Sequence, residues 1–95
     1  MPEVLNARVV GTSRPGAVYC GRPSVWGNPF PAKDGITRSD AIQRFEIWFM
    51  AQPELIARAK RELKGKDLIC WCAPKRCHCD ILLREANSIL DDLFN

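Results

Sequence analysis

The stretch DLICWCAPKRCHCDILLREA occupies residues 67–86 and joins two patterns that together decide the fold. Its first six residues, 67–72, are mostly apolar or cysteine, which predicts a buried β-strand. From residue 81 onward, apolar residues recur every three or four positions, which predicts a final helix over residues 81–94. A strand followed at once by a helix is the repeating unit of an α/β fold, so we expect parallel strands covered by helices.

The segments that precede this stretch supply the other elements of the fold. Short β-prone runs at residues 8–10 and 17–20 are separated by glycines and prolines, and we predict that they are strands. Between residues 37 and 63 the apolar spacing becomes helical, and Pro53 divides this part into two helices because proline is tolerated in a first turn. We therefore expect one domain over residues 1–95, a small Rossmann-like α/β sandwich with about three helices on a three- or four-stranded, mostly parallel sheet.

Composition and charge describe an ordinary globular chain. Of its residues, 46% are hydrophobic and 26% are charged, values that do not fit disordered or fibrous proteins. No stretch approaches the roughly 20 apolar residues of a spanning helix, and the N-terminus lacks the pattern of a secretory signal, so we expect a cytoplasmic protein without a membrane partner. The net charge of +3 arises before the last predicted helix, which fits either a solvated surface or a phosphate-bearing partner.

Four of the five cysteines and the one histidine lie in the run CWCAPKRCHCD, residues 70–80, where the predicted strand meets the predicted helix. Ligand sites in open α/β sheets lie beyond the carboxyl ends of strands. A cysteine near a helix N-terminus and beside basic residues is favoured as a thiolate, and Cys77 has this position. Cys77 and His78 are therefore the candidate nucleophile and proton-transfer group, with Asp80 as the residue that orients them.

Two other interpretations of this cluster stay open. Cysteine packs well as a small hydrophobic residue, so Cys70 and Cys20 can belong to the core, and Asp80 can be a helix cap. Alternatively, the cluster holds a structural zinc ion, for which the candidate ligands are Cys70, Cys72, Cys77, His78 and Cys79. We favour no cofactor, because the Cys-x-x-Cys spacing of zinc knuckles is absent and adjacent ligands need an unusual turn.

The spacing of Cys70 and Arg76 also matches Cys-x5-Arg, with which phosphatase loops surround a phosphate. Here the cysteine lies inside the predicted strand, and Pro74 lacks one of the backbone donors that such a loop uses. We therefore interpret the match as a coincidence of a short pattern.

A second candidate region is YCGRPSVWGNPF, residues 19–30, a loop dense in residues that are costly to expose. It offers an arginine fork for phosphate, a tryptophan face on which a base can stack and an asparagine amide. The candidate ligand-binding residues are Arg22, Ser24, Trp26 and Asn28 from this loop and Arg76 from the cysteine-rich run. Trp26 and Phe30 can instead fill the small core.

Both regions resemble the signature blocks of a family of bacterial and phage proteins, domain of unknown function 4326. The blocks are GRPSVWGNPF at residues 21–30 and CWCAPKRCH at residues 70–78. The Cys-His dipeptide at residues 77–78 is similar, more distantly, to a strand-to-helix turn in another α/β group, domain of unknown function 488. The family usually has glycine where this chain has Cys79, so the resemblance implies no four-thiolate site.

Both resemblances imply a small Rossmann-like enzyme or binding domain that acts on nucleotides or nucleic acid. Our leading hypothesis is one cleft between the Arg22 loop and the cysteine-rich turn, where a nucleotide or nucleic-acid-derived phosphate binds and a Cys/His pair acts on it. The alternative is a non-enzymatic phage or bacterial effector that binds a protein or nucleic acid, with structural zinc in the cluster. The sequence leaves open whether the chain is an enzyme.

Overall fold

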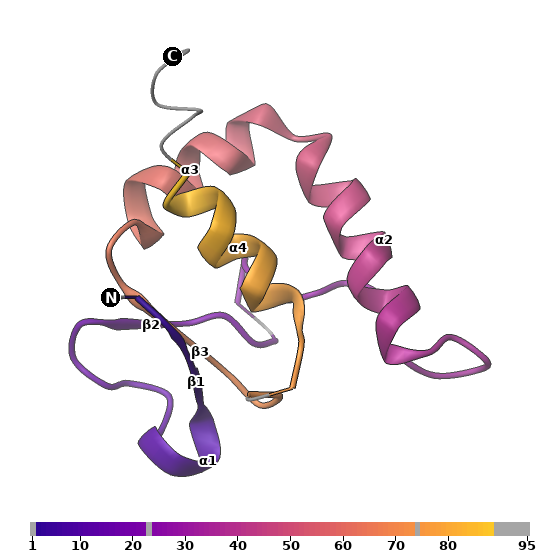
Figure 1. The fold of residues 1–95 in the computed structure, drawn as a ribbon, viewed down its shortest axis with the longest axis horizontal. Helices are drawn as coiled ribbons and strands as arrows, with labels where there is room; N and C mark the ends of the chain where they lie inside the picture. The colour runs from indigo at the N-terminus through magenta and orange to yellow at the C-terminus, as the bar shows by residue number, and fades with distance from the viewer. Residues whose placement is uncertain (1, 23, 74, 89–95) are drawn as a thin grey trace.

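The computed structural model describes residues 2–22, 24–73 and 75–88 of the chain (Figure 1). Its elements are β1 (Val4–Asn6), α1 (Ala7–Val10), β2 (Ala17–Tyr19), α2 (Arg38–Met50), α3 (Pro53–Leu63), β3 (Asp67–Cys70) and α4 (His78–Ala86). The strands form a three-stranded parallel sheet in the order β1-β3-β2. The α/β class and the parallel sheet predicted from the sequence are confirmed.

The central strand β3 determines where the sheet ends. Its residues Leu68, Ile69 and Cys70 are buried, because β1 and β2 flank the strand and α4 packs on it. The register pairs Asn6 of β1 with Cys70, and Tyr19 of β2 with Ile69. All three strands therefore end at the same edge of the sheet, which is the edge where ligand sites of parallel sheets lie.

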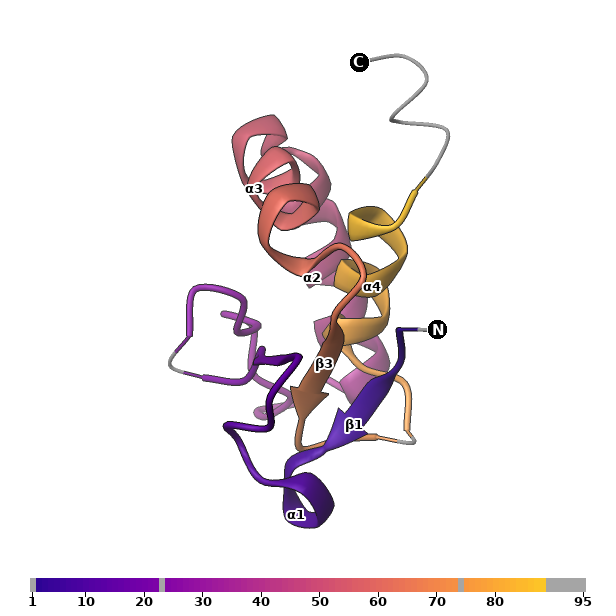
Figure 2. The ribbon, with the colours of Figure 1, turned by 90° about the vertical axis from the view of Figure 1, so that its left-hand side faces the viewer.

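Helices α2, α3 and α4 gather beside the sheet, whereas α1 lies apart from them at the end of β1 (Figure 2). Helix α4 packs on β1 and β3, and both α2 and α3 pack against α4. Phe45, Phe49, Leu63 and Leu82 are almost completely buried among these elements. Each such side chain stabilises the fold by about 1.5–3 kcal/mol, so the core holds the helices around the sheet edge. None of the helices in the described residues is long and apolar enough to cross a membrane.

The starts of α2 and α3 follow from local chemistry. Thr37 accepts a hydrogen bond from the N–H of Asp40, whose carboxylate accepts one from the N–H of Thr37, so a capping box begins α2. Pro53 occupies the first turn of α3, where its missing N–H costs nothing. The predicted division into two helices is confirmed.

The first predicted strand is wrong. Residues 8–10 belong to α1, and the strand lies just before them. The side-chain oxygen of Asn6 accepts a hydrogen bond from the N–H of Arg8 at 2.8 Å, which starts a helical turn although the residues that follow are β-prone.

The boundaries of β3 and α4 also differ from the prediction. Strand β3 ends at Cys70, two residues early, because the Asn6 amide donates to the carbonyl oxygen of Ala73 at 2.7 Å and holds the chain in a turn. Helix α4 begins at His78, three residues before the predicted start, because the first turn has its own capping residues. The predicted continuation of this helix over residues 89–94 lies outside the described residues.

Candidate functional site

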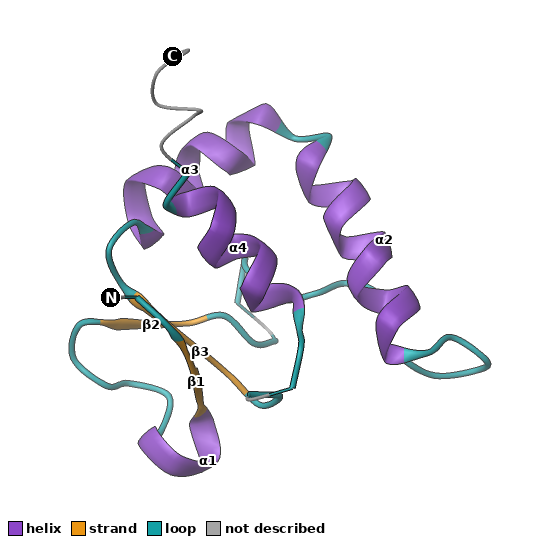
Figure 3. Cartoon of the chain, viewed as in Figure 1, coloured by secondary structure: helices purple, strands orange, loops and turns teal. Residues whose placement is uncertain are grey.

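A cavity of about 370 Å³ opens at the edge of the sheet where β2 and β3 end. Its walls come from the ends of these strands, the loops that follow them (Figure 3), the N-terminal half of α2 and the start of α4. The lining residues are Tyr19, Gly21, Arg22, Asn28, Phe30, Ala32, Arg38, Ala41, Ile42, Cys70, Trp71, Cys72, Cys77 and His78. Both signature segments of the sequence therefore contribute to one cavity.

The cavity wall is basic and aromatic. Arg22 and Arg38 are its charged members, and no carboxylate occurs among the lining residues in the described part of the chain. Tyr19, Phe30 and Trp71 add aromatic surface. Guanidinium forks bind phosphate oxygens and aromatic faces stack on bases, so the wall suits an anionic ligand with a flat ring.

Arg22 is positioned by the loop that carries it. Its Nε donates to the carbonyl oxygen of Asn28 at 2.8 Å, which uses one of its five N–H donors. The Asn28 side chain accepts from the N–H of Phe30 at 2.8 Å and donates to the carbonyl oxygen of Ala41 in α2 at 3.2 Å. Gly27 allows the close approach, because a Cβ there would lie 3.2 Å from the Arg22 backbone. Asn28 therefore acts mainly as the residue that shapes the loop and joins it to α2.

Trp71 and Tyr19 form a second fixed unit beside the cavity. Trp71 directly follows β3, and 51% of its surface is exposed. Its Nε1–H donates to the Tyr19 hydroxyl at 2.8 Å, and that hydroxyl donates to the carbonyl oxygen of Arg22 at 3.0 Å. A large exposed ring held by hydrogen bonds can contact a ligand without first leaving the core.

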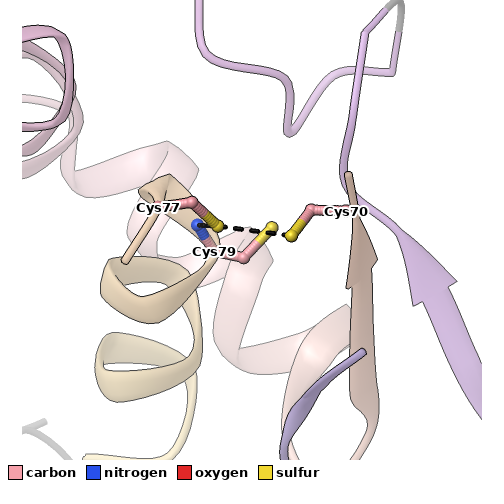
Figure 4. Close-up of side chains that lie close together, drawn as sticks. All are labelled: Cys70, Cys77 and Cys79. Carbon is pink, nitrogen blue, oxygen red and sulfur yellow. Dashed lines mark hydrogen bonds between the residues drawn. The ribbon is translucent and has the colours of Figure 1, made fainter. Parts of the chain in front are cut away.

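Three cysteines bring their sulfur atoms together next to this cavity. Cys70 comes from the end of β3, and Cys77 and Cys79 come from the start of α4 (Figure 4). Their Sγ atoms all lie within 4.8 Å of one another, and all three residues are buried. The Cys70 and Cys77 Sγ atoms are 3.3 Å apart. Three buried thiols in this arrangement can hold a metal ion.

Within the cluster, the surroundings favour a thiolate at Cys70. Its Sγ accepts a hydrogen bond from the N–H of Cys72 at 3.4 Å. Hydrogen bonds from Cys77 and Cys79 outweigh burial and lower the pKa of Cys70, whereas the Cys70 sulfur raises the pKa of Cys77. These pKa directions favour Cys70 over Cys77 as the thiolate of the cluster, and the role of Cys77 as a nucleophile stays a prediction.

His78 is buried at the first position of α4. Its Nε2 lies 2.8 Å from the carbonyl oxygen of Cys20, and since a carbonyl only accepts, we assign the proton to Nε2. Burial lowers the pKa of His78, so the ring is neutral at pH 7. The ring also packs edge-on against Phe45 with centroids 5.2 Å apart. His78 thus joins the start of α4 to the loop after β2.

Asp80 caps helix α4. Its carboxylate accepts a hydrogen bond from the N–H of Cys77 at 2.9 Å, and the Cys77 sulfur accepts one from the N–H of Cys79 at 3.4 Å. The capping interpretation of Asp80 is confirmed, and its effect on the chemistry of His78 stays a prediction.

Three predicted ligand-binding residues lie away from the described cavity wall. Trp26 is only 4% exposed and belongs to the core cluster, with the Arg58 guanidinium 5.6 Å from its ring centre. Ser24 donates its hydroxyl to the carbonyl oxygen of Gly21 at 2.6 Å and stabilises a turn. Arg76 is exposed on the loop before α4. Arg22 and Asn28, the other two, do line the cavity.

Sequence reasoning misses Arg38, which lines the cavity, and Asn6, which supports the turn beside it. Arg38 follows Thr37, a recognisable helix start, but nothing local shows that α2 faces the loop at residues 19–30. Asn6 holds the turn after β3 across 67 positions of sequence. The available sequence signal for Asn6 is a polar residue at the end of a short β-prone run, and this signal is weak.

Comparisons with known proteins now identify the family. The family model described as Domain of unknown function (DUF4326) matches residues 6–88. The chain belongs to the DUF4326 family. This DUF4326 chain is also 37% identical, over 76 residues, to the "Uncharacterized 12.4 kDa protein in nrdA-td intergenic region" of Enterobacteria phage T4. The match covers 77% of this chain and 69% of the phage protein. No solved structure matches the chain significantly.

Proposed function

We propose that this DUF4326 domain binds a nucleotide or a nucleic-acid-derived phosphate in the cavity at the ends of β2 and β3. The observation that carries the proposal is the composition of the wall, which has two arginines and three aromatic rings but no carboxylate among its described residues. An anionic group and a flat ring are the two features that such a wall recognises together.

The phosphate would bind between the two guanidinium groups. Arg22 extends from the loop after β2 and Arg38 from the first turn of α2. A hydrogen bond to a charged group contributes about 1.5–3 kcal/mol, and both arginines are exposed enough for water to weaken this. We therefore expect each arginine to contribute about a factor of ten to affinity. Asn28 would act by holding Arg22 in place.

The base would lie against the aromatic part of the wall. Trp71 and Tyr19 are fixed by their shared hydrogen bond, and Phe30 packs edge-on against Trp48 of α2. The volume of about 370 Å³ is near the lower end of the range of about 300–1,000 Å³ for small-molecule sites. This size favours a single nucleotide over a dinucleotide.

Cys77 and His78 border the same cavity and would act on the bound ligand. The Nε2–H of His78 is engaged with Cys20, so chemistry at this ring would need that bond to break or would use the other nitrogen. Asp80 would contribute by holding the start of α4, on which both residues lie.

Isothermal titration calorimetry with nucleoside 5′-monophosphates and the matching nucleosides tests this proposal. We expect the monophosphates to bind and the nucleosides to bind at least about tenfold more weakly, because only the former can use the arginines. Arg22→Gln and Arg38→Gln should each weaken binding about tenfold. Arg44→Gln, which changes an exposed arginine of α2 outside the cavity wall, should leave it unchanged. Equal binding of nucleosides and monophosphates, or equal losses in all three variants, would contradict the proposal.

A further inference from the structure

We propose that Cys70, Cys77 and Cys79 bind one zinc ion as three thiolate ligands, with the fourth position of the ion facing the cavity. The inference does not depend on the nature of the cavity's ligand. It rests on the arrangement of the three sulfur atoms, on the backbone groups that surround them and on which of them borders the cavity.

The sulfur separations fit a tetrahedral zinc ion with small adjustments. A zinc–sulfur bond of about 2.3 Å at tetrahedral angles places two sulfur atoms about 3.8 Å apart. The Cys70 and Cys77 Sγ atoms are 3.3 Å apart, and no pair in the cluster exceeds 4.8 Å. The Cys70–Cys77 separation is about 0.5 Å below the ideal value, and no other pair can exceed that value by more than about 1 Å, so shifts of less than about 1 Å in each side chain would complete the site.

Backbone N–H groups are already directed at two of the three sulfur atoms. The N–H of Cys72 donates to the Cys70 Sγ and the N–H of Cys79 donates to the Cys77 Sγ, both at 3.4 Å. Donors of this kind stabilise ligating thiolates and fix their orientation. The cluster also lies at the N-terminus of α4, where the helix dipole favours negative charge.

The structure narrows the ligand set predicted from the sequence. Cys72 is half-buried, and its sulfur is not part of the compact group. The His78 Nε2 lies 3.7 Å from the Cys79 Sγ, but it carries a proton that it donates to the carbonyl oxygen of Cys20. The compact group of possible ligand atoms contains neither ring nitrogen of His78, so the three thiolates remain.

The fourth coordination position would open toward the cavity. Cys70 and Cys77 line the cavity, whereas Cys79 is completely buried behind them. Three protein ligands with one open position are the arrangement of reactive zinc sites, in which water or a substrate atom completes the coordination. The site would therefore place a Lewis-acidic ion at the wall of the cavity that Arg22 also lines. Because three thiolates more than neutralise the charge of Zn²⁺, a ligand atom would bind there by direct coordination.

Metal analysis of the full chain tests the site, with the cysteine variants as its internal comparison. The wild-type protein and the Cys72→Ser variant should each hold one zinc ion per chain after dialysis. Cys70→Ser and Cys79→Ser should bind zinc more than about a hundredfold more weakly. This loss exceeds the roughly 10–100-fold loss in metal affinity that is typical when only a residue hydrogen-bonded to a metal ligand is changed. Circular dichroism would establish that each variant is folded. Zinc-free wild-type protein that stays zinc-free after incubation with zinc would overturn the site, and so would loss of zinc from Cys72→Ser.

Cobalt substitution tests the same site without mutation. Tetrahedral cobalt bound by thiolates gives a sulfur-to-metal charge-transfer band in the near ultraviolet, which we expect from the wild-type protein. Added imidazole should shift the visible bands of this cobalt protein, because it can enter the open position. Absence of the charge-transfer band would refute the thiolate ligands, and visible bands that imidazole does not change would refute the open position.

Discussion

The Nε2–H of His78, at the start of α4, donates a hydrogen bond to the carbonyl oxygen of Cys20, 2.8 Å away and directly after β2. The two residues are 58 positions apart in the sequence. Both are buried, so this bond connects the two segments that form the cavity and does not compete with water. His78 thus has a structural task whether or not it also takes part in chemistry.

Replacing His78 with alanine should therefore destabilise the protein strongly. The Cys20 carbonyl would lose its partner and a space would open beside Phe45, so we expect a loss of about 2–4 kcal/mol in the free energy of unfolding. His78→Gln, which keeps an N–H donor, should lose clearly less. Urea denaturation followed by circular dichroism measures both values, and equal losses in the two variants would show that the hydrogen bond is unimportant.

Asp80→Ala should lower stability with little effect on ligand affinity. The change removes the acceptor for the Cys77 N–H at the start of α4, and loss of such a cap costs about 1 kcal/mol. Asp40→Ala removes the corresponding residue of the capping box of α2 and is the matched control, for which we expect a similar loss. A fully stable Asp80→Ala protein with abolished binding would instead give Asp80 a direct role at the ligand.

Trp71→Ala should lower ligand affinity with little effect on stability, which is the reverse of the result expected for Asp80→Ala. Stacking of a base on an aromatic ring contributes about 1–3 kcal/mol, so we expect ligand affinity to fall at least about fivefold. Trp71 is half exposed, and its removal should cost no more than about 1 kcal/mol of stability, mainly from the lost bond to Tyr19. Trp71→Phe keeps a ring and should retain most of the affinity. If both variants bind as the wild type does, the ring does not contact the ligand.

The sequence predicts the elements of this fold best where apolar residues repeat regularly. The stripe that includes Phe45 and Phe49 identifies α2, and Pro53 marks the start of α3. Prediction fails where one polar side chain overrides a local preference. The β-prone residues 8–10 are helical because of Asn6, and the same side chain ends β3 early by holding the loop that follows.

The two segments that form the candidate site could be predicted from the sequence, but the role of each residue within them could not. Trp26 and Trp71 both lie in signature blocks, yet Trp26 enters the core while Trp71 remains exposed beside the cavity. Trp71 directly follows β3, where the Asn6 amide holds the turn, whereas Trp26 packs in the core cluster. Arg38 joins the site only because of how α2 packs, and no local pattern contains that information.

The most direct test of ligand binding in the cavity is a titration of ¹⁵N-labelled protein with a nucleoside 5′-monophosphate, followed by NMR through the indole N–H signals. The chain has three tryptophans, and only Trp71 is among the described residues that line the cavity. We predict that the Trp71 signal shifts progressively with ligand while the signal of Trp26, in the core, stays in place. A Trp71 signal that does not move at saturating ligand, or a Trp26 signal that moves in its stead, would contradict the proposed site.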